Sequence, residues 1–313
     1  QSRSSAASDV YKRQTISSGM SKTPTISVRQ EYIKSFIGGA AIVAKHLKIA
    51  GADVKFSTIL GEDSLQGFVT NEICSNGINF HCTIDKNRVT TQKNVFISSG
   101  YRLLKVDKLD NRPISQSALN KLQESLNSDY FNAYIFSDFR HGIFNQETIP
   151  KLIDCLPTQG LRVADSQVAS RWGNILDFKG FDLITPNEQE VRFSLADQDS
   201  VIRPLALELY KQAQCKTLIM KLGNKGILTY CAPSNSSGSF FSIDSFCENL
   251  VDPIGAGDAL LAYSTLGMVA TNSPVISSIL GSFAAGVACE IEGNNPVTPE
   301  AVINKLERVE NSL

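Results

Sequence analysis

The chain has 313 residues, of which 42% are hydrophobic and 19% are charged. This length suits one large α/β domain or roughly two average domains, and the apolar fraction excludes a wholly disordered protein. With 30 Lys and Arg against 31 Asp and Glu, the formal net charge of −1 argues against nucleic-acid or membrane-surface binding driven by bulk charge. A local basic pocket for a phosphorylated small molecule is compatible with this balance.

Cysteine usage and apolar runs indicate the compartment. No segment has the ~18 uninterrupted apolar residues that a membrane span needs. The seven cysteines form no Cys-x-x-Cys pair, and the three histidines are not spaced as metal ligands. A scattered, odd number of cysteines fits reduced thiols better than disulfides or a zinc site. We therefore expect a cytoplasmic enzyme without a disulfide framework.

The first twenty residues differ in composition from the rest. Residues 1–14 (QSRSSAASDVYKRQ) are polar and rich in serine, and they lack the apolar core of a secretory signal. They resemble translated cloning or adaptor sequence. We therefore assign residues 1–20 to a foreign-looking or disordered leader and residues 21–313 to one domain, and we expect natural N-terminal chain to be missing.

From residue 33 onward, strand-like and helix-like stretches alternate. Short apolar runs predict strands at Val54–Leu60, Ala133–Ser137, Leu161–Asp165, Asp182–Thr185 and Thr217–Leu222. Helical patterns lie between them at Ala40–Ala50, Ser64–Ser75, Ser115–Asn127, Gln146–Cys155 and Val201–Gln214. Strands that alternate with helices indicate βαβ units and a mostly parallel sheet covered on both faces.

Two β-rich runs interrupt this alternation. Thr91–Ser98 and Tyr101–Asp107 are separated by Ser99-Gly100, which is a hairpin signal. A hairpin inside an α/β chain predicts a small flap on the main sheet, here a lid over residues 84–112.

Further helices are marked by their ends. The apolar segment Ile276–Cys289 predicts a buried helix, and Thr298 before Pro299 predicts a helix start. Asn187 and Glu190 have the spacing of a capping box, with Asn in the place of Ser or Thr.

The sharpest chemical signal is Gly255-Ala256-Gly257-Asp258, followed by a long apolar helical pattern. The glycines leave backbone N–H groups unobstructed at a helix start, where unpaired donors and the helix dipole gather anions. In the first turn, Asp258 can take a proton from a hydroxyl while the amides hold a transferring phosphoryl group. The alternative is an ordinary Gly-containing turn with an acidic residue in the first helical turn.

Two earlier stretches support the phosphoryl-transfer interpretation: residues 38–45 (GGAAIVAK) open an early helix with small residues, and residues 61–67 (GEDSLQG) follow a strand. Together with residues 255–258, they resemble the ribokinase-like (PfkB) family of carbohydrate kinases, from about residue 36 to residue 302. The resemblance implies a three-layer α/β/α fold with a central, mostly parallel sheet and a small β flap. It also implies an ATP- and Mg²⁺-dependent phosphotransferase that acts on an alcohol group.

Within that family, the likeness is greatest to the heptose-7-phosphate kinase domain of ADP-heptose synthesis. Residues 90–93 (TTQK) with 102–107 (RLLKVD) resemble its substrate flap. Residues 137–142 (SDFRHG) resemble its Ser-Asp-Tyr-x-Lys-Gly loop, and residues 182–190 (DLITPNEQE) resemble its Leu-Thr-Pro-Asn-x-x-Glu segment.

The resemblance implies roles on the phosphoryl side. Asp258 would be the catalytic base, and the amides of Gly255, Ala256 and Gly257 would form the anion hole. Asn187 and Glu190 match the family's Asn-x-x-Glu motif, which organises Mg²⁺ and its waters, and the capping box can hold at the same time. The matching nucleotide-contacting loop contributes Lys221, Gly223 and Gly226, for which a plain β-turn is the alternative.

On the sugar side, the resemblance places Gly38 and Gly39 at the substrate. Lys93, Arg102 and Lys105 lie on the predicted hairpin, where alternate strand positions reach one face and suit a sugar phosphate; a solvated hairpin is the alternative. Asp138 ends a strand, where α/β sheets place ligand sites, or it initiates a turn. His141 stands where the relatives carry Lys.

Four departures from the family pattern fall mainly on the sugar side. No convincing first strand precedes Gly38, and Ile42 replaces an Asn that hydrogen-bonds sugar, a loss on the order of 1–3 kcal/mol. Pro253-Ile254 replaces residues that are often Thr, and no nucleotidyltransferase domain follows Val302. The exposed sheet edge of a missing strand makes a homodimer a candidate assembly.

Three functions therefore stay open. The first is a kinase for a sugar or sugar phosphate of the heptose 7-phosphate type. The second is a non-catalytic or N-terminally truncated ligand-binding relative on the same fold. The third is a kinase for another sugar or a nucleoside. A dinucleotide-dependent dehydrogenase is disfavoured because no Gly-x-Gly-x-x-Gly follows a first strand.

Overall fold

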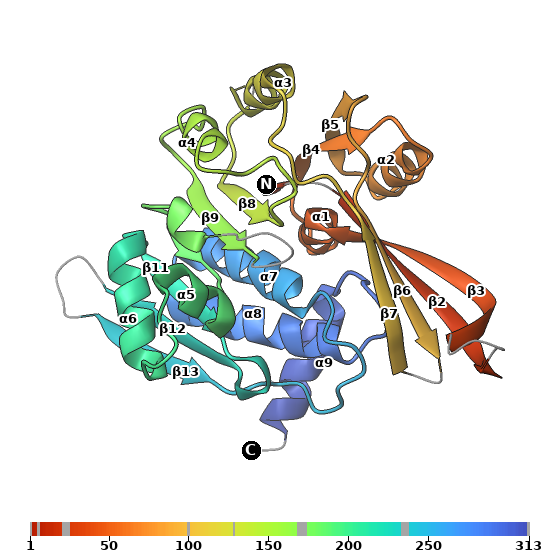
Figure 1. Ribbon diagram of the computed structural model, residues 1–313. Helices are drawn as coiled ribbons and strands as arrows, with labels where there is room; N and C mark the ends of the chain where they lie inside the picture. The colour runs from red at the N-terminus through yellow and green to blue at the C-terminus, as the bar shows by residue number, and fades with distance from the viewer. Residues whose placement is uncertain are drawn as a thin grey trace.

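A seven-stranded sheet forms the middle of the molecule (Figure 1). Its strand order is β1-β8-β9-β10-β11-β12-β13; neighbours run parallel from β1 to β11, and the last two pairings are antiparallel. Parallel pairing brings the carboxyl ends of β8 to β11 to one edge, where α/β sheets bind ligands. The strands are β1 (Ser2–Ser4), β8 (Ala133–Asp138), β9 (Leu161–Ser166), β10 (Leu183–Ile184), β11 (Thr217–Lys221), β12 (Ile227–Cys231) and β13 (Ser239–Ile243).

The structure is a computed structural model that describes residues 2–4, 7–20, 26–98, 101–127, 129–167, 174–232 and 238–311, those up to residue 27 by their backbone alone. The predicted hairpin turn Ser99-Gly100 lies outside these ranges, as does most of the Ser/Gly-rich stretch 233–239. Within the same ranges, no helix has both the length and the apolar character needed to cross a bilayer.

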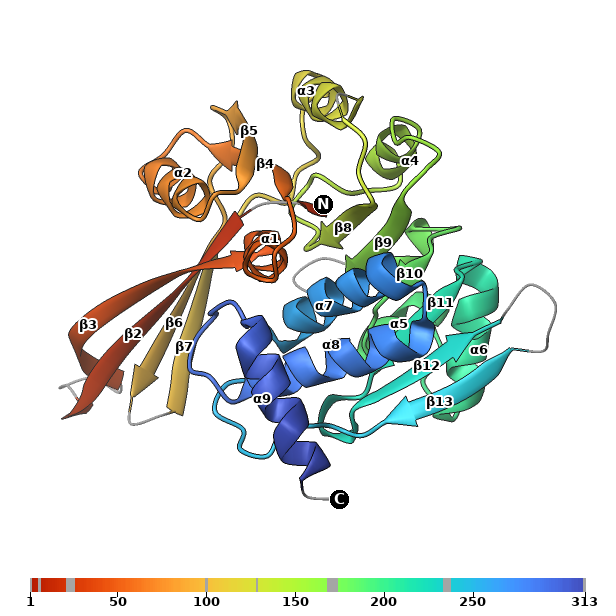
Figure 2. The ribbon, with the colours of Figure 1, turned by 180° about the vertical axis from the view of Figure 1, so that it is seen from behind.

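Helices cover both faces of the sheet, and each face has its own apolar core. Along β8, Ile135 belongs to one core, whereas Tyr134 and Phe136 belong to the other, as side-chain alternation in a strand requires. This arrangement confirms the three-layer α/β/α fold (Figures 1 and 2). The first core packs against α1 (Ala40–Ile49), α7 (Ala256–Thr271), α8 (Pro274–Cys289) and α9 (Pro299–Glu310), and the second against α3 (Gln116–Asn127), α4 (Thr148–Ile153), α5 (Glu188–Leu195) and α6 (Ile202–Ala213).

A separate four-stranded sheet with the order β3-β2-β6-β7 projects beside the body and forms the lid (Figure 2). The predicted hairpin is present as the antiparallel pair β6 (Gln92–Ser98) and β7 (Tyr101–Lys108). The lid extends beyond residues 84–112, because β2 (Ala7–Met20) pairs with β6, and β3 (Ile26–Gly39) pairs with β2. A third, two-stranded sheet joins β4 (Lys55–Gly61) to β5 (Asn79–Asp85) through α2 (Leu65–Ser75).

Residues 1–20 differ from the expectation that they stand outside the fold. The backbone of Ser2–Ser4 pairs with β8, and that of Ala7–Met20 pairs with both β3 and β6. The expectation depended on the missing apolar pattern, whereas backbone pairing needs only N–H and C=O groups. A strand therefore precedes Gly38, and β1 lies along the sheet edge that was expected to be open.

The elements predicted between residues 40 and 222 are present within a few residues of their expected ends. The predicted buried helix is α8, and Thr298 caps α9 by accepting a hydrogen bond from the Ala301 N–H at 3.2 Å. The antiparallel strands β12 and β13 were not predicted.

Helices α7 and α8 pack with almost no space between them. A Cβ on Gly267 would lie 2.8 Å from the Cα of Ser277, and one on Gly281 would collide with the Ser264 hydroxyl oxygen. The Ser277 hydroxyl in turn donates to the carbonyl of Ser264. Small residues therefore fix α7, whose N-terminus faces the site described next, against its neighbour.

Candidate active site

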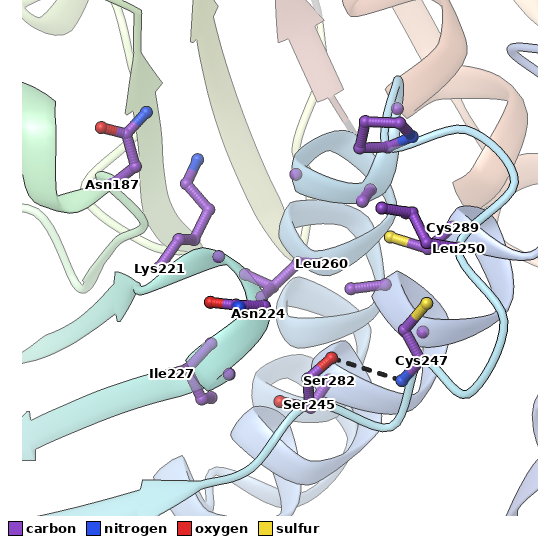
Figure 3. Close-up of a pocket in the computed structure, with 18 of the residues that line it drawn as sticks. Asn187, Lys221, Asn224, Ile227, Ser245, Cys247, Leu250, Leu260, Ser282 and Cys289 are labelled. Carbon is purple, nitrogen blue, oxygen red and sulfur yellow. Dashed lines mark hydrogen bonds between the residues drawn. The ribbon is translucent and has the colours of Figure 1, made fainter.

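A cavity of about 680 Å³ opens where β11, the segment after β13 and the N-terminus of α7 meet (Figure 3). Its walls include every residue predicted for the phosphoryl and nucleotide side. These residues are Asn187, Glu190, Lys221, Gly223, Gly226, Gly255, Ala256, Gly257 and Asp258. Residues that are up to 71 positions apart in the sequence thus line one space.

The N-terminus of α7 forms one end of the cavity. Gly255 is the N-cap residue with φ 84°, a left-handed conformation that glycine adopts readily. The first N–H groups of the helix have no partner within the helix, so they form an anion-binding end. Gly257 widens it, because a Cβ there would lie 3.5 Å from Lys221 Nζ.

Asp258 lies in the first turn of α7 and is 8% exposed. Its Oδ1 atom is buried and has no hydrogen-bond partner within the described part of the chain. Burial, together with the nearby Asp165, raises the pKa of Asp258 to about 7, although Lys221 and Lys93 act in the opposite direction. A carboxylate with an unpaired oxygen and a pKa near 7 is suited to general-base catalysis.

Lys221 ends β11 and crosses beneath the α7 N-terminus. Its ammonium donates to Asp165 Oδ1 at 2.8 Å, and the Thr185 hydroxyl donates to the same oxygen at 3.1 Å. Burial alone would lower the pKa of Lys221, but the carboxylates of Asp165, Glu190 and Asp258 outweigh it and raise the pKa. The lysine is therefore a fixed positive charge in the cavity.

Asn187 and Glu190 form the predicted capping box at the start of α5. The Glu190 N–H donates to Asn187 Oδ1 at 2.8 Å, and the Asn187 N–H donates to Glu190 Oε2 at 2.7 Å. The capping box holds a buried carboxylate, with Glu190 4% exposed, at the cavity wall.

The glycine loop after β11 is a 3₁₀ turn at Gly223–Lys225. Gly226 follows it with φ 80°, and a Cβ there would collide with the carbonyl of Ile243 in β13. Gly223 has φ 63° and faces open space. Close strand approach thus explains Gly226, whereas Gly223 lies at the cavity with room beside it.

On the sugar side, the structure brings the predicted residues together less well. Gly38 and Gly39 are buried where β3 meets α1, and neither they nor the fully buried Ile42 lines the cavity. Asp138 is 1% exposed and bonded within the fold: it accepts from the Arg140 N–H at 2.7 Å and from the Ser166 hydroxyl at 2.8 Å. Burial raises the pKa of Asp138 to about 6, despite the opposing charge of Arg140.

Two lid lysines lie near the catalytic end of the site. Lys93 Nζ lies 5.1 Å from the ring centre of Phe139, and burial and then Lys105 lower its pKa, while Asp107 and Asp258 act in the opposite direction. Lys105 pairs with Asp107 at 3.0 Å. His141 is close enough to both lysines that burial and their charges hold its pKa at about 4.

Arg102 is placed differently from the other lid cations. Its Nη2 atom lies 2.9 Å from Oδ1 of Asp252, which is 3% exposed. Asp252 also accepts from the N–H groups of Ile254 and Gly293. Arg102 therefore joins the lid to the loop that enters the anion-binding end.

Several site residues were missed by sequence reasoning. Asp165 ends β9 just as Asp138 ends β8, so its position at the carboxyl edge of the sheet could have marked it. Asp252 lies directly before the glycine motif. The remaining cavity wall, which includes Leu250, Leu260 and Gly286, carries no local sequence signal.

The described residues fit a magnesium-bound nucleoside triphosphate. The apolar wall suits a base, the α7 N-terminus and Lys221 suit phosphates, and the unpaired Asp258 oxygen faces the end at which transfer would occur. Within the described ranges, no three His, Cys, Asp or Glu side chains gather as a metal site. This fits Mg²⁺, which is commonly held by one or two carboxylates together with waters and phosphate oxygens.

The fold matches that of solved sugar kinases. Phosphofructokinase-2 from Escherichia coli, in complex with substrates and products, superposes with a TM-score of 0.80 at 16% identity over 98% of this chain and 99% of that one. Ribokinase from Arabidopsis thaliana, complexed with ribose and ATP, gives a TM-score of 0.74 at 15% identity over 98% of both chains. At these identities the likeness defines a ribokinase-like fold.

The chain belongs to the pfkB family of carbohydrate kinases, which it matches over residues 7–301, and it is therefore a phosphotransferase. It is similar to proteins called bifunctional protein HldE, with 23% identity over 288 residues in Geobacter sulfurreducens and 24% over 284 residues in Sulfurimonas denitrificans. These alignments cover 90% and 88% of this chain but 57% of each relative. The chain thus spans little more than half the length of these relatives.

Proposed function

We propose that this kinase transfers the γ-phosphoryl group of ATP to a hydroxyl of a sugar or sugar phosphate, with Asp258 as the base. One observation carries the proposal. A buried carboxylate oxygen without a hydrogen-bond partner lies in the first turn of a helix whose N-terminus lines the same cavity. A base and an anion-binding end are thereby placed side by side, as phosphoryl transfer to a hydroxyl requires.

The residues would act as follows. When bound, Mg·ATP supplies the phosphoryl group that moves to the acceptor oxygen, with ADP as the leaving group. Asp258 accepts the hydroxyl proton as the new P–O bond forms, and the N–H groups of the first α7 turn hold the charge on the moving group. Asn187 and Glu190 would hold Mg²⁺ through water, while Lys221, Gly223 and Gly226 would border the nucleotide.

We assign a phosphorylated sugar of the heptose 7-phosphate type as the acceptor. The HldE-named relatives support this assignment, and so does the presence of Lys93 and Lys105 near Asp258. A phosphate on the acceptor would supply the anion that two adjacent lid cations favour. Gly38 and Gly39 border the lid, whereas Asp138 and Arg102 act through bonds within the protein.

A small-molecule substrate in the cytoplasm fits the family and the reduced cysteines. We further propose a homodimer that forms through the lid. All eight residues of β7, an edge strand, are exposed, with Leu104 at 56% and Tyr101 at 76%. An exposed apolar edge strand is normally covered by a partner.

The test is ADP release from Mg·ATP across a panel of sugars and sugar phosphates, heptose 7-phosphate included, with Asp258→Asn as the variant. Turnover should fall by ~10² or more without the base, while ADP still binds. The variant should also melt at a higher temperature than the wild type at pH 8, where the wild type must keep a buried carboxylate ionised. Turnover that persists in Asp258→Asn would remove Asp258 from the mechanism.

A further inference from the structure

A buried ion pair lies directly under the anion-binding end of α7. Lys221 comes from the end of β11 and Asp165 from the end of β9, and their Nζ and Oδ1 atoms are 2.8 Å apart. Their side chains are 16% and 4% exposed. Because Thr185 donates to the same carboxylate oxygen at 3.1 Å, the acceptor is itself fixed.

The ammonium has capacity left for a ligand. Lysine carries three N–H donors, and Asp165 is the acceptor that the described structure gives to Lys221. Lys221 lines the cavity and extends into it (Figure 3). Two donors are thus available to whatever enters.

Gly257 determines what the ammonium can reach. A Cβ at this position would lie 3.5 Å from Lys221 Nζ and 3.8 Å from its Cδ. Only hydrogen therefore separates the first turn of α7 from the ammonium, so a group held by the helix N–H donors also lies within reach of Lys221. The charge is directed at the anion-binding end rather than at the apolar wall for the base.

The surrounding charge supports the same placement. Lys221 interacts with the carboxylates of Asp165, Glu190 and Asp258, so one ammonium faces three acidic groups. A transferring phosphoryl group would add further negative charge beside Asp258. A fixed cation at that point lowers the cost of bringing two negative groups together.

We propose that Lys221 is a catalytic residue that contacts the transferring phosphoryl group, and that Asp165, supported by Thr185, is a positioning residue for it. This inference depends on the proposed function and adds the residue that balances charge during transfer. Contact with the nucleoside or with the phosphates nearer to it is not its main role.

The main test compares Lys221→Met with the wild type in two measurements. Loss of one donor at an anion hole lowers kcat by ~10²–10³, and we expect a fall in that range with KM for the sugar nearly unchanged. Without sugar, calorimetry should show Mg·ADP binding within about threefold of wild type, while any added affinity for the β,γ-imido analogue of Mg·ATP is lost. Lys221→Arg, which keeps the charge, should recover part of kcat.

Two further variants address folding and specificity. Lys221→Met leaves Asp165 buried without its cation, so the neutral pair Lys221→Met with Asp165→Asn serves as a folding control. Asp165→Asn alone should lower kcat by about tenfold while ADP affinity is kept, as expected of a supporting residue. Lys216→Met is the matched control, since Lys216 is 77% exposed and pairs with Asp182 away from the cavity.

The outcomes separate the two proposals. If the wild type turns over sugar and Lys221→Met keeps its kcat, or loses ADP and analogue affinity in parallel, the role of Lys221 is refuted and the proposed function stands. If the wild type binds nucleotide but phosphorylates no sugar in the panel, the proposed function fails. In that case, analogue affinity above that for ADP, lost in Lys221→Met, would still support the contact with the terminal phosphate.

Discussion

The nucleotide side and the lid side of this kinase are built by different means. On the nucleotide side, every predicted residue lines one cavity, and each is held by a helix end, a strand end or a tight turn. On the lid side, Arg102 pairs with Asp252 and Lys105 pairs with Asp107, although the sequence groups both with Lys93. Local backbone geometry places the first set, whereas sheet pairing and charge placement decide the second.

The comparison shows where phosphoryl chemistry is fixed and where substrate choice can vary. Helix caps and glycine turns are specified by a few neighbouring residues, so the nucleotide side needs little long-range information. Lid cations find partners only after strands from distant parts of the chain have paired. Predictions that treat the two sides separately can break or sharpen this distinction.

The largest effect is expected from pH, acting on the nucleotide side. Asp258 accepts a proton only when ionised, and burial raises its pKa to about 7. The value of kcat/KM should therefore fall tenfold per unit below pH 7, reaching about 100-fold at pH 5 relative to the plateau above pH 8. The measurement is kcat/KM from pH 5 to 9, with circular dichroism at each pH as the folding control. An acid limb centred near pH 4 would show that Asp258 is solvated rather than buried.

A smaller effect is expected from the link between lid and body. Arg102→Ala removes the ion pair to Asp252, a buried carboxylate that also holds the Ile254 N–H. We expect the sugar KM to rise by about tenfold or less, because Arg102 is half exposed and its pair is partly screened. Lys108→Ala on the same strand is the matched control, and an equal KM change in both variants would assign the effect to general lid charge.

The smallest effect on turnover is expected at the outer edge of the lid. Leu104→Glu places a charge on β7, far from the cavity wall, so kcat should change by less than about twofold. Light scattering after size-exclusion chromatography should give twice the 34.1 kDa chain mass for the wild type and a single chain mass for the variant. A monomeric wild type would refute the proposed dimer.

Much of the fold could be read from the sequence. The alternation of apolar runs and helical patterns gives the parallel sheet and its covering helices, and the Asn187 and Glu190 spacing gives the start of α5. The antiparallel strands β12 and β13 were missed because no βαβ unit connects them. The strands formed by residues 2–20 were missed because their polar composition carries no period.

The candidate site was predicted unevenly for a related reason. The glycine motif at the start of α7 specifies its own geometry, so Asp258 could be found from sequence. Asp165 could not be connected with Lys221, since their contact joins two strands 56 residues apart. For the same reason, nothing local distinguishes Arg102, which crosses 150 positions to reach Asp252, from Lys93.

The close packing of α7 against α8 also limits how this enzyme can diverge. Even one added carbon at Gly267 or Gly281 would meet Ser277 or Ser264 and push α7 away from its neighbour. That displacement would carry the anion-binding end away from Lys221, so a change distant from the chemistry would be felt as a loss of turnover. We expect engineered or natural variation to accumulate in the lid, while these two helices must change together or not at all.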